Sequence, residues 1–134
     1  MPCPYFEPQR IARQPKHPGA RLPLLDEYDG LCHAFGGPVP ETERFRSCNH
    51  GYSRGECGHF PENGSGSCFR FEVLHRTADW LEVLRVEEQG YAPVQWQPFR
   101  FSIQTGRVEP EPIDACALAQ LRAFCSSYLR RFSQ

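Results

Sequence analysis

The chain has 134 residues, a formal net charge of −1 and 40% hydrophobic residues, a size that fits a single domain. The balanced charge gives no basic surface for nucleic acid, and no apolar run reaches the length that spans a membrane, so we expect neither partner. The first residues lack a charged stretch followed by an apolar one, so we expect no secretory signal and a cytoplasmic location. In that reducing compartment, seven cysteines more often bind metal or remain thiols than form disulfides.

Residues 1–23 are rich in proline, and Cys3 stands directly before Pro4. A residue before proline prefers an extended backbone, and the repeated prolines exclude a long helix. Tyr5 and Phe6 are large aromatic side chains that need a surface to cover them. We therefore expect this segment to be held against the domain, with Cys3 as the metal ligand that holds it.

Residues 22–35, LPLLDEYDGLCHAF, can form a short helical turn that ends at Gly30. Cys32 follows closely, and the glycines and prolines at 36–40 predict a turn. This part of the chain therefore presents a cysteine between two turns.

Residues 41–45 can open a short helix that leads into the loop Ser47–Pro61, SCNHGYSRGECGHFP. This loop holds two cysteines and two histidines among three glycines, and it has no apolar periodicity. Such a composition is typical of half of a metal site. Residues 61–67, PENGSGS, have linker composition and separate a cysteine-rich half, 1–67, from residues 68–134 of the same domain.

The second half has the clearer periodicity. Alternating apolar residues predict strands at 68–74, 80–88 and 94–103, with a change of phase and an edge or bulge at Pro98. Residues 107–109 can add a short strand. A helix begins after Asp114 as N-cap and carries one apolar stripe, made of Ala117, Leu121, Phe124, Cys125, Tyr128 and Phe132. The predicted class is α+β, a loop-rich N-terminal half followed by an antiparallel sheet of three to four strands packed by a C-terminal helix.

The cysteines divide by context. Cys68 opens a strand, and Cys116 and Cys125 lie nine positions apart on the helix, which places them on opposite faces. We interpret these three as structural. The other four lie in loops with Gly or Pro nearby, and we predict that they bind one metal centre: Cys3, Cys32, Cys48 and Cys57.

Four thiolates fit either a [4Fe–4S] cluster or a structural zinc ion. Zinc sites usually contain close cysteine pairs, whereas Cys48 and Cys57, the closest two of the four, have eight residues between them. Dispersed single cysteines favour a cubane. Three histidines, His33, His50 and His59, each lie within two residues of a predicted ligand and can supply a Cys/His zinc site. Zinc and the absence of any metal remain open alternatives.

The segments MPCPYFEP, GLCHAF and CNHGYSRGECGHFP resemble a group of small uncharacterised bacterial proteins with four spaced cysteines. The resemblance spans about the first half of the chain and implies that the four cysteines form a set. Their spacing matches neither ferredoxin motifs, which need C-x₂-C-x₂-C, nor the knuckles of zinc ribbons.

The expected function is iron–sulfur binding for electron transfer or redox sensing, with a redox or protein partner that the sequence does not identify. The alternative is a zinc-stabilised protein-interaction module without a redox role. The chain contains no nucleophile elbow, Walker A motif or dinucleotide fingerprint, so the sequence does not indicate an enzyme.

Overall fold

The computed structural model describes residues 2–13, 22–39, 44–50, 57, 67–90, 92–112 and 114–132, and of residues 45–47, 67 and 68 it describes the backbone alone. One antiparallel sheet has the order β1 (Phe6–Ile11), β2 (Tyr28–Cys32) and β3 (Gly37–Pro38). A second has the order β4 (Ser67–Arg76), β5 (Trp80–Gln89), β6 (Ala92–Ser102) and β7 (Val108–Glu109). The π-helix η1 (Arg44–Asn49) lies between the sheets in sequence, and helix α2 (Ala115–Arg131) follows them. The predicted α+β class is confirmed.

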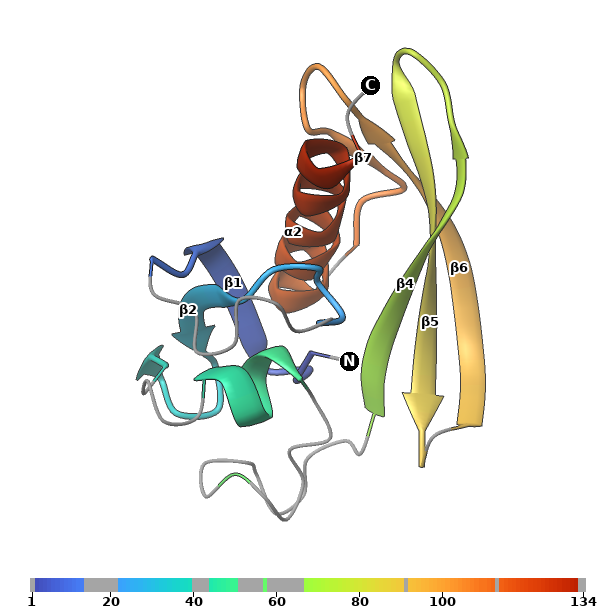
Figure 1. Cartoon of the computed structure of the whole chain (residues 1–134). Coiled ribbons are helices and arrows are strands. Elements are labelled where there is room, and N and C mark those ends of the chain that lie inside the picture. Colours follow the sequence, from blue (N-terminus) through green and yellow to red (C-terminus); the bar gives the residue numbers. More distant parts are fainter. Residues whose placement is uncertain are drawn as a thin grey trace.

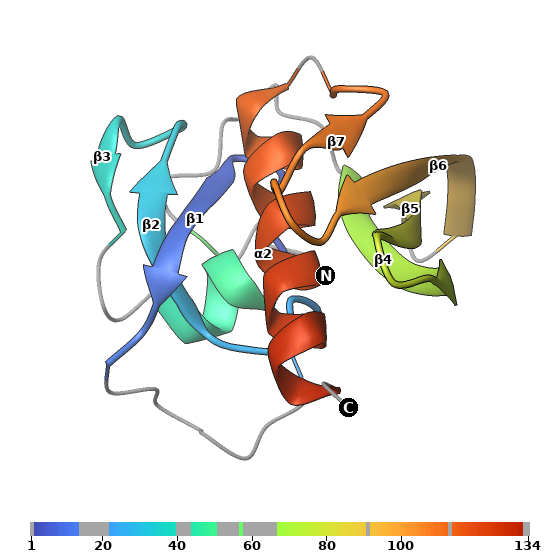
Figure 2. The same ribbon diagram turned by 90° about the horizontal axis from the view of Figure 1, so that it is seen from above.

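Helix α2 is the middle layer of the molecule. Figures 1 and 2 show it between the β1–β2–β3 sheet and the β4–β5–β6 strands. The phenol of Tyr28 on β2 donates a hydrogen bond to the carbonyl oxygen of Ala123, 2.9 Å away. On the other side, the ring of Phe124 stacks on Phe71 of β4 with centroids 5.5 Å apart. Both faces of the helix are therefore covered by a sheet.

The two faces of α2 differ in composition. The predicted N-cap is confirmed, because Asp114 accepts a hydrogen bond from the Cys116 N–H at 2.8 Å. The predicted apolar stripe is buried at Ala117, Leu121, Phe124 and Cys125, whereas Phe132 is 53% exposed. A second buried stripe at helical spacing consists of Cys116, Gln120, Ala123 and Ser127. The side chains of this stripe are small or polar, so apolar periodicity did not reveal it. The helix therefore packs on two faces, and not only on the predicted apolar one.

The second sheet is close to the prediction. Its inward face contains buried Phe69, Phe71, Leu81, Val83, Phe99 and Phe101, and burying each such side chain contributes roughly 1.5–3 kcal/mol. Of the two alternatives predicted at Pro98, the edge position is confirmed, because β7 does not reach it, and the bulge is wrong, because pairing with β5 runs without a register shift from Gln95 to Ser102. The register shift lies instead between Glu87 and Glu88. Pro98 tolerates its place because β7 pairs only with Arg100 and Phe101, which leaves Pro98 outside the β6–β7 ladder.

The first sheet was not predicted. A turn is present at the start of this region, where the Leu25 N–H donates to Leu22 O at 2.9 Å. The prediction that a helical turn continues to Gly30 is wrong, because Tyr28–Cys32 form strand β2. Gly30 pairs with Pro8 of β1, and a Cβ added there would lie 2.0 Å from the carbonyl oxygen of Glu7. Glycine is required because the two backbones approach this closely. The aromatic Phe6 of β1 is 1% exposed, so residues 2–13 of the N-terminal segment are held against the domain as expected, whereas residues 14–21 lie outside the described residues.

Candidate cysteine site

Cys3 and Cys48 lie side by side although 44 residues separate them in sequence. The Cys3 N–H donates to the Cys48 carbonyl oxygen at 3.0 Å. The Cys3 carbonyl oxygen accepts from the Phe6 N–H, also at 3.0 Å, in the turn that leads into β1. Cys3 is 7% exposed and Cys48 is 6% exposed, so both belong to the interior. This contact joins the N-terminal segment to η1.

Cys32 ends strand β2 next to the same segment. It is the antiparallel partner of Phe6, three residues after Cys3. The turn after Cys32 is closed by Gly36, whose φ of +86° suits glycine and whose N–H donates to the Cys32 carbonyl oxygen at 2.7 Å. Within this turn the Phe35 N–H donates to the Cys32 Sγ at 3.2 Å. An amide directed at a cysteine sulfur is one of the contacts that tune an iron–sulfur cluster.

A further thiol, Cys116, lies in the first turn of α2, where Cys3 and Cys32 act on it electrostatically. One helical turn later, the Gln120 side chain donates to two carbonyl oxygens of the N-terminal segment, that of Cys3 at 2.8 Å and that of Phe6 at 2.9 Å. Burial raises the pKa of the Cys116 thiol to about 12, and the neighbouring acidic groups that add to this shift are Asp114, Glu7, Cys3 and Cys32. The buried cysteine of the first helical turn therefore lies at the junction of α2 with the cysteine-bearing segments.

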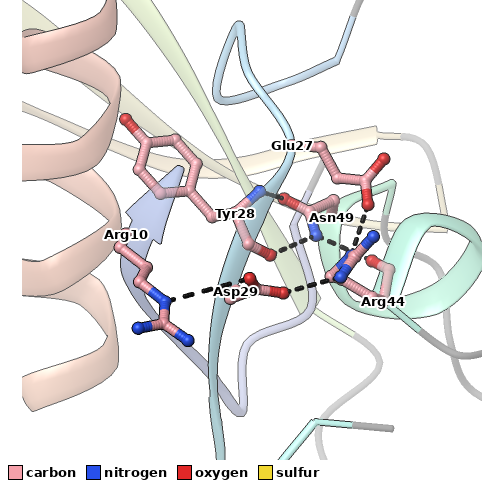
Figure 3. A network of polar contacts seen from close by, with 6 residues as sticks. All are labelled: Arg10, Glu27, Tyr28, Asp29, Arg44 and Asn49. Atoms are coloured by element: carbon pink, nitrogen blue, oxygen red, sulfur yellow. Dashed lines mark hydrogen bonds and ion pairs between the residues drawn. The ribbon is translucent and has the colours of Figure 1, made fainter. Parts of the chain in front are cut away.

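Asn49 fixes η1, and with it Cys48, to strand β2. Figure 3 shows its amide facing the backbone of Tyr28, whose N–H donates to Asn49 Oδ1 at 2.8 Å and whose carbonyl oxygen accepts from Nδ2 at 3.0 Å. Nδ2 also donates to the Arg44 carbonyl oxygen at 2.7 Å. The side chain thus bonds to Tyr28 as the backbone of an adjacent strand would. Because Asn49 is 0% exposed and both ends of its amide are bonded, these contacts determine how η1 lies on β2.

Two carboxylates hold the first residue of η1. Arg44 forms an ion pair with Glu27, whose side chain is 1% exposed, and a second with Asp29 at 2.8 Å (Figure 3). Burial acts to lower the pKa of Arg44, but its hydrogen bonds to the two carboxylates outweigh this and raise the pKa above its ordinary value. A buried ion pair of this kind contributes more to the choice of one geometry than to stability. Arg44 and Asn49 therefore position Cys48 from both ends of η1.

The other predicted ligands are distributed as follows. Cys57 is a partly buried free thiol. The residues on both sides of it, 51–56 and 58–66, lie outside the described residues. The His33 Nε2 lies 2.7 Å from Glu7 Oε1, so this imidazole is paired with a carboxylate. The pKa of His50 is lowered, first because part of its ring is buried and then because of the positive N-terminus, although most of the residue is exposed. His59 and most of the loop Ser47–Pro61 lie outside the described residues.

An open groove of about 620 Å³ lies between β1 and α2. Its polar lining includes the guanidinium groups of Arg10 and Arg122 and the hydroxyl of Ser126. These groups are suited to a small anion, but Glu7 also lines the groove and offsets part of the positive charge.

Comparison of the chain with family models, curated proteins and solved structures finds no match. Within the described ranges, no group of three or more His, Cys, Asp or Glu side chains is close enough to form a ready metal site. No helix in the part of the chain that the structure describes is long and apolar enough to cross a membrane.

Sequence reasoning missed three contributors to this region, Cys116, Asn49 and Gln120. One signal was present for Cys116 and Gln120, since they stand four residues apart on the helix and share a face opposite the apolar stripe. For Asn49 no sequence signal existed, because its partner Tyr28 lies 21 residues away in an unpredicted strand.

Proposed function

We propose that this protein binds a [4Fe–4S] cluster through cysteine thiolates and acts in electron transfer or redox sensing in the cytoplasm. What supports the proposal is that three cysteine-bearing segments are neighbours: the backbones of Cys3 and Cys48 are hydrogen-bonded, and Cys32 pairs with Phe6, three residues after Cys3. Soft thiolates favour iron–sulfur clusters and zinc over hard cations. The sequence predicts Cys57 as the fourth ligand.

The local structure supports a cluster in two ways. Each of the three cysteines belongs to a separate segment, and a cubane suits this because its four thiolates bind four different irons and stand farther apart than the ligands of one zinc ion. The Phe35 N–H already bonds to the Cys32 sulfur at 3.2 Å. When bound, the cluster would supply one-electron redox chemistry, and the chain's part is to hold the thiolates, exclude water and direct amides at sulfur.

Anaerobic purification of the full chain tests the proposal. We expect brown protein with a broad absorption band near roughly 400 nm and about four iron and four sulfide per chain. Colourless protein with stoichiometric zinc would replace the proposal with a zinc-stabilised interaction module. Protein that takes up neither zinc nor iron with sulfide during reconstitution would refute a metal function.

A further inference from the structure

The groove between β1 and α2 has the size and the two walls of a ligand site. Its volume of about 620 Å³ lies within the range of about 300–1,000 Å³ that is usual for small-molecule pockets. One wall is formed by consecutive residues of β1, Glu7 to Ile11. The other wall is one face of α2, with Ala119, Arg122, Ala123 and Ser126. Because alanine and serine side chains are short, the helix leaves space beside the strand.

A β-bulge in β1 carries the first cation of the groove, Arg10. Pro8 and Arg10 pair with consecutive residues of β2, so Gln9 is an extra residue in β1. Bulges bend a strand and redirect its side chains, and they are frequent next to active sites. Figure 3 shows the Arg10 side chain and the Tyr28 ring on the same side of β2, toward α2, and both residues line the groove. The strand therefore presents a positive charge to the groove.

The carboxylates of Asp29 and Glu7 have closer partners than Arg10. Asp29 Oδ1 accepts a hydrogen bond from Arg44 at 2.8 Å, whereas the Arg10 Nε lies 4.0 Å from Asp29 Oδ2, beyond hydrogen-bond distance. Glu7 lines the groove, but its Oε1 lies 2.7 Å from the Nε2 of His33. The Arg10 guanidinium donates no hydrogen bond to the described part of the chain. An anion in the groove is therefore a suitable acceptor for its N–H groups.

Arg122 supplies a second cation, from the helix wall. Its Nε donates to the Gly106 carbonyl oxygen at 3.2 Å, which limits the motion of the side chain. This is the only hydrogen bond that its guanidinium makes with the described residues, so its two Nη groups remain as donors. The fork of a guanidinium matches the two oxygens of a carboxylate. Apolar groups make up much of the remaining lining, from Pro8, Ile11, Tyr28, Ala119 and Ala123.

We propose that this groove binds a small organic anion, with its carboxylate held by Arg10 and Arg122 and its apolar body against Ile11 and the alanines of α2. The arginines of both walls match the charge of such a ligand, and the apolar lining matches its body. An inorganic anion such as phosphate would use the arginines but not the apolar lining. The inference goes beyond the proposed function and does not depend on a bound metal.

Saturation-transfer difference NMR on the full chain, purified anaerobically, tests the proposal. The probes are benzoate and hexanoate, which combine a carboxylate with an aromatic or an aliphatic body. Benzamide and hexanamide keep the body without the charge, and inorganic phosphate keeps a charge without the body. We expect saturable binding of at least one carboxylate, about tenfold tighter than binding of its amide. Phosphate should displace that carboxylate only at about tenfold higher concentration, because it does not use the apolar lining.

Four variants assign the binding to the groove. Arg10→Gln and Arg122→Gln each remove one cation and should each weaken binding about tenfold. Ala119→Phe fills the space without a change of charge and should abolish binding. Arg100→Gln is the matched control, because Arg100 is an exposed arginine of β6 that lies over the Trp80 ring and does not line the groove. This variant should bind the carboxylate as the natural chain does.

Circular dichroism checks that each variant is folded, and if one groove variant fails to fold, the other two decide. Absence of saturable binding of both carboxylates up to about 20 mM overturns the inference. Equal affinity for a carboxylate and its amide, or equal weakening in Arg100→Gln, also overturns it. Phosphate that binds as tightly as the carboxylate shows a simple ion site and overturns the assignment of an organic ligand.

Discussion

At the scale of single residues, the buried amide of Asn49 decides how the cysteine-bearing helix η1 attaches to the sheet. It accepts one hydrogen bond and donates two, all to backbone groups. A substitution that keeps its shape but removes its donors therefore tests the contact without opening a cavity.

Asn49→Asp is expected to be strongly destabilising. The carboxyl group retains an acceptor for the Tyr28 N–H. Its second oxygen would face the carbonyl oxygens of Tyr28 and Arg44, which now accept hydrogen bonds from Nδ2. We expect a loss of about 3 kcal/mol in the free energy of unfolding, measured by urea denaturation. Because Cys48 precedes Asn49, metal content should fall as well.

Tyr28→Phe provides the comparison for this prediction. It removes the phenol that bonds to Ala123 O at 2.9 Å and Ser127 Oγ at 2.5 Å, on the side of β2 that faces α2. This change should cost about 1 kcal/mol and leave metal content unchanged. Equal metal loss in both variants would show that general destabilisation, and not the attachment of η1, controls binding.

At the scale of elements, the last turn of α2 is tied to the segment before β2 by Asp26. Its carboxylate pairs with Arg130 and lies 2.7 Å from the Arg131 Nη2, and the side chain is 10% exposed. Burial acts to raise the pKa of Asp26, but hydrogen bonds from Ser127, Arg131 and Arg130 outweigh it, so the pKa lies below its ordinary value of 3.8. The two arginines also suit the negative end of the helix dipole.

This depressed pKa fixes the sign of a pH dependence. The ionised form of Asp26 stabilises the fold above the ordinary pKa, and this stability is lost as pH falls through the lower pKa of the folded state. Asp26→Asn should therefore lower the free energy of unfolding at pH 7 by about 1 kcal/mol, and the difference should shrink as pH falls below the ordinary pKa of 3.8. Thermal or urea unfolding across this pH range measures it.

Asp79→Asn is the control for the pH series. Asp79 lies exposed in the turn between β4 and β5, where its backbone N–H bonds to Thr77 Oγ1 at 3.3 Å. Its replacement measures the effect of the same Asp→Asn change at an exposed turn away from α2. A constant difference for Asp26→Asn from pH 7 to pH 3 would contradict a role for its charge.

At the scale of the whole molecule, the sequence predicted the second sheet well because its inward residues are large and apolar and alternate with polar ones. Phe69 and Phe71 on β4 and Phe99 and Phe101 on β6 carry that pattern, and all four are buried. The first sheet has no such pattern. In β1 the residues Pro8, Gln9 and Arg10 follow Phe6, and in β2 Asp29 and Gly30 follow Tyr28, so long-range pairing rather than periodicity forms these strands.

The candidate site was predicted in part for the same reason. Neighbouring Gly and Pro residues predicted a loop around each of Cys3, Cys32 and Cys48, but this is wrong for two of them, because Cys32 ends strand β2 and Cys48 lies in η1. The position of α2 between two sheets requires the first sheet, which the sequence did not predict (Figure 2). A polar, small-residue stripe gives no apolar signal, although it packs as closely as an apolar one at Ala123 and Ser127, which are 7% and 1% exposed.

The last prediction concerns the order in which the two sheets lose structure when metal is removed. The first sheet buries few large apolar side chains, chiefly Phe6 and Tyr28, and depends on polar contacts at its junction with η1. Metal binding should therefore supply much of its folding free energy. After chelation, we expect amide hydrogen exchange to speed up first at the Cys3 N–H, bonded to Cys48 O, and at the His33 N–H, bonded to Tyr5 O. Protection in the ladder between β5 and β6 should persist.

Phe71→Leu serves as the control, because it should weaken the second sheet first and leave the first sheet protected. It weakens the stack of Phe71 on Phe124, whose centroids lie 5.5 Å apart, at the contact between β4 and α2. We expect a cost of about 1 kcal/mol, faster exchange in β4, and full metal content, because Cys3, Cys32 and Cys48 belong to the first sheet, its N-terminal lead and η1. Simultaneous loss of protection in both sheets of the natural chain after chelation would contradict the prediction. It would mean that α2, which contacts both sheets, makes them unfold as one cooperative unit.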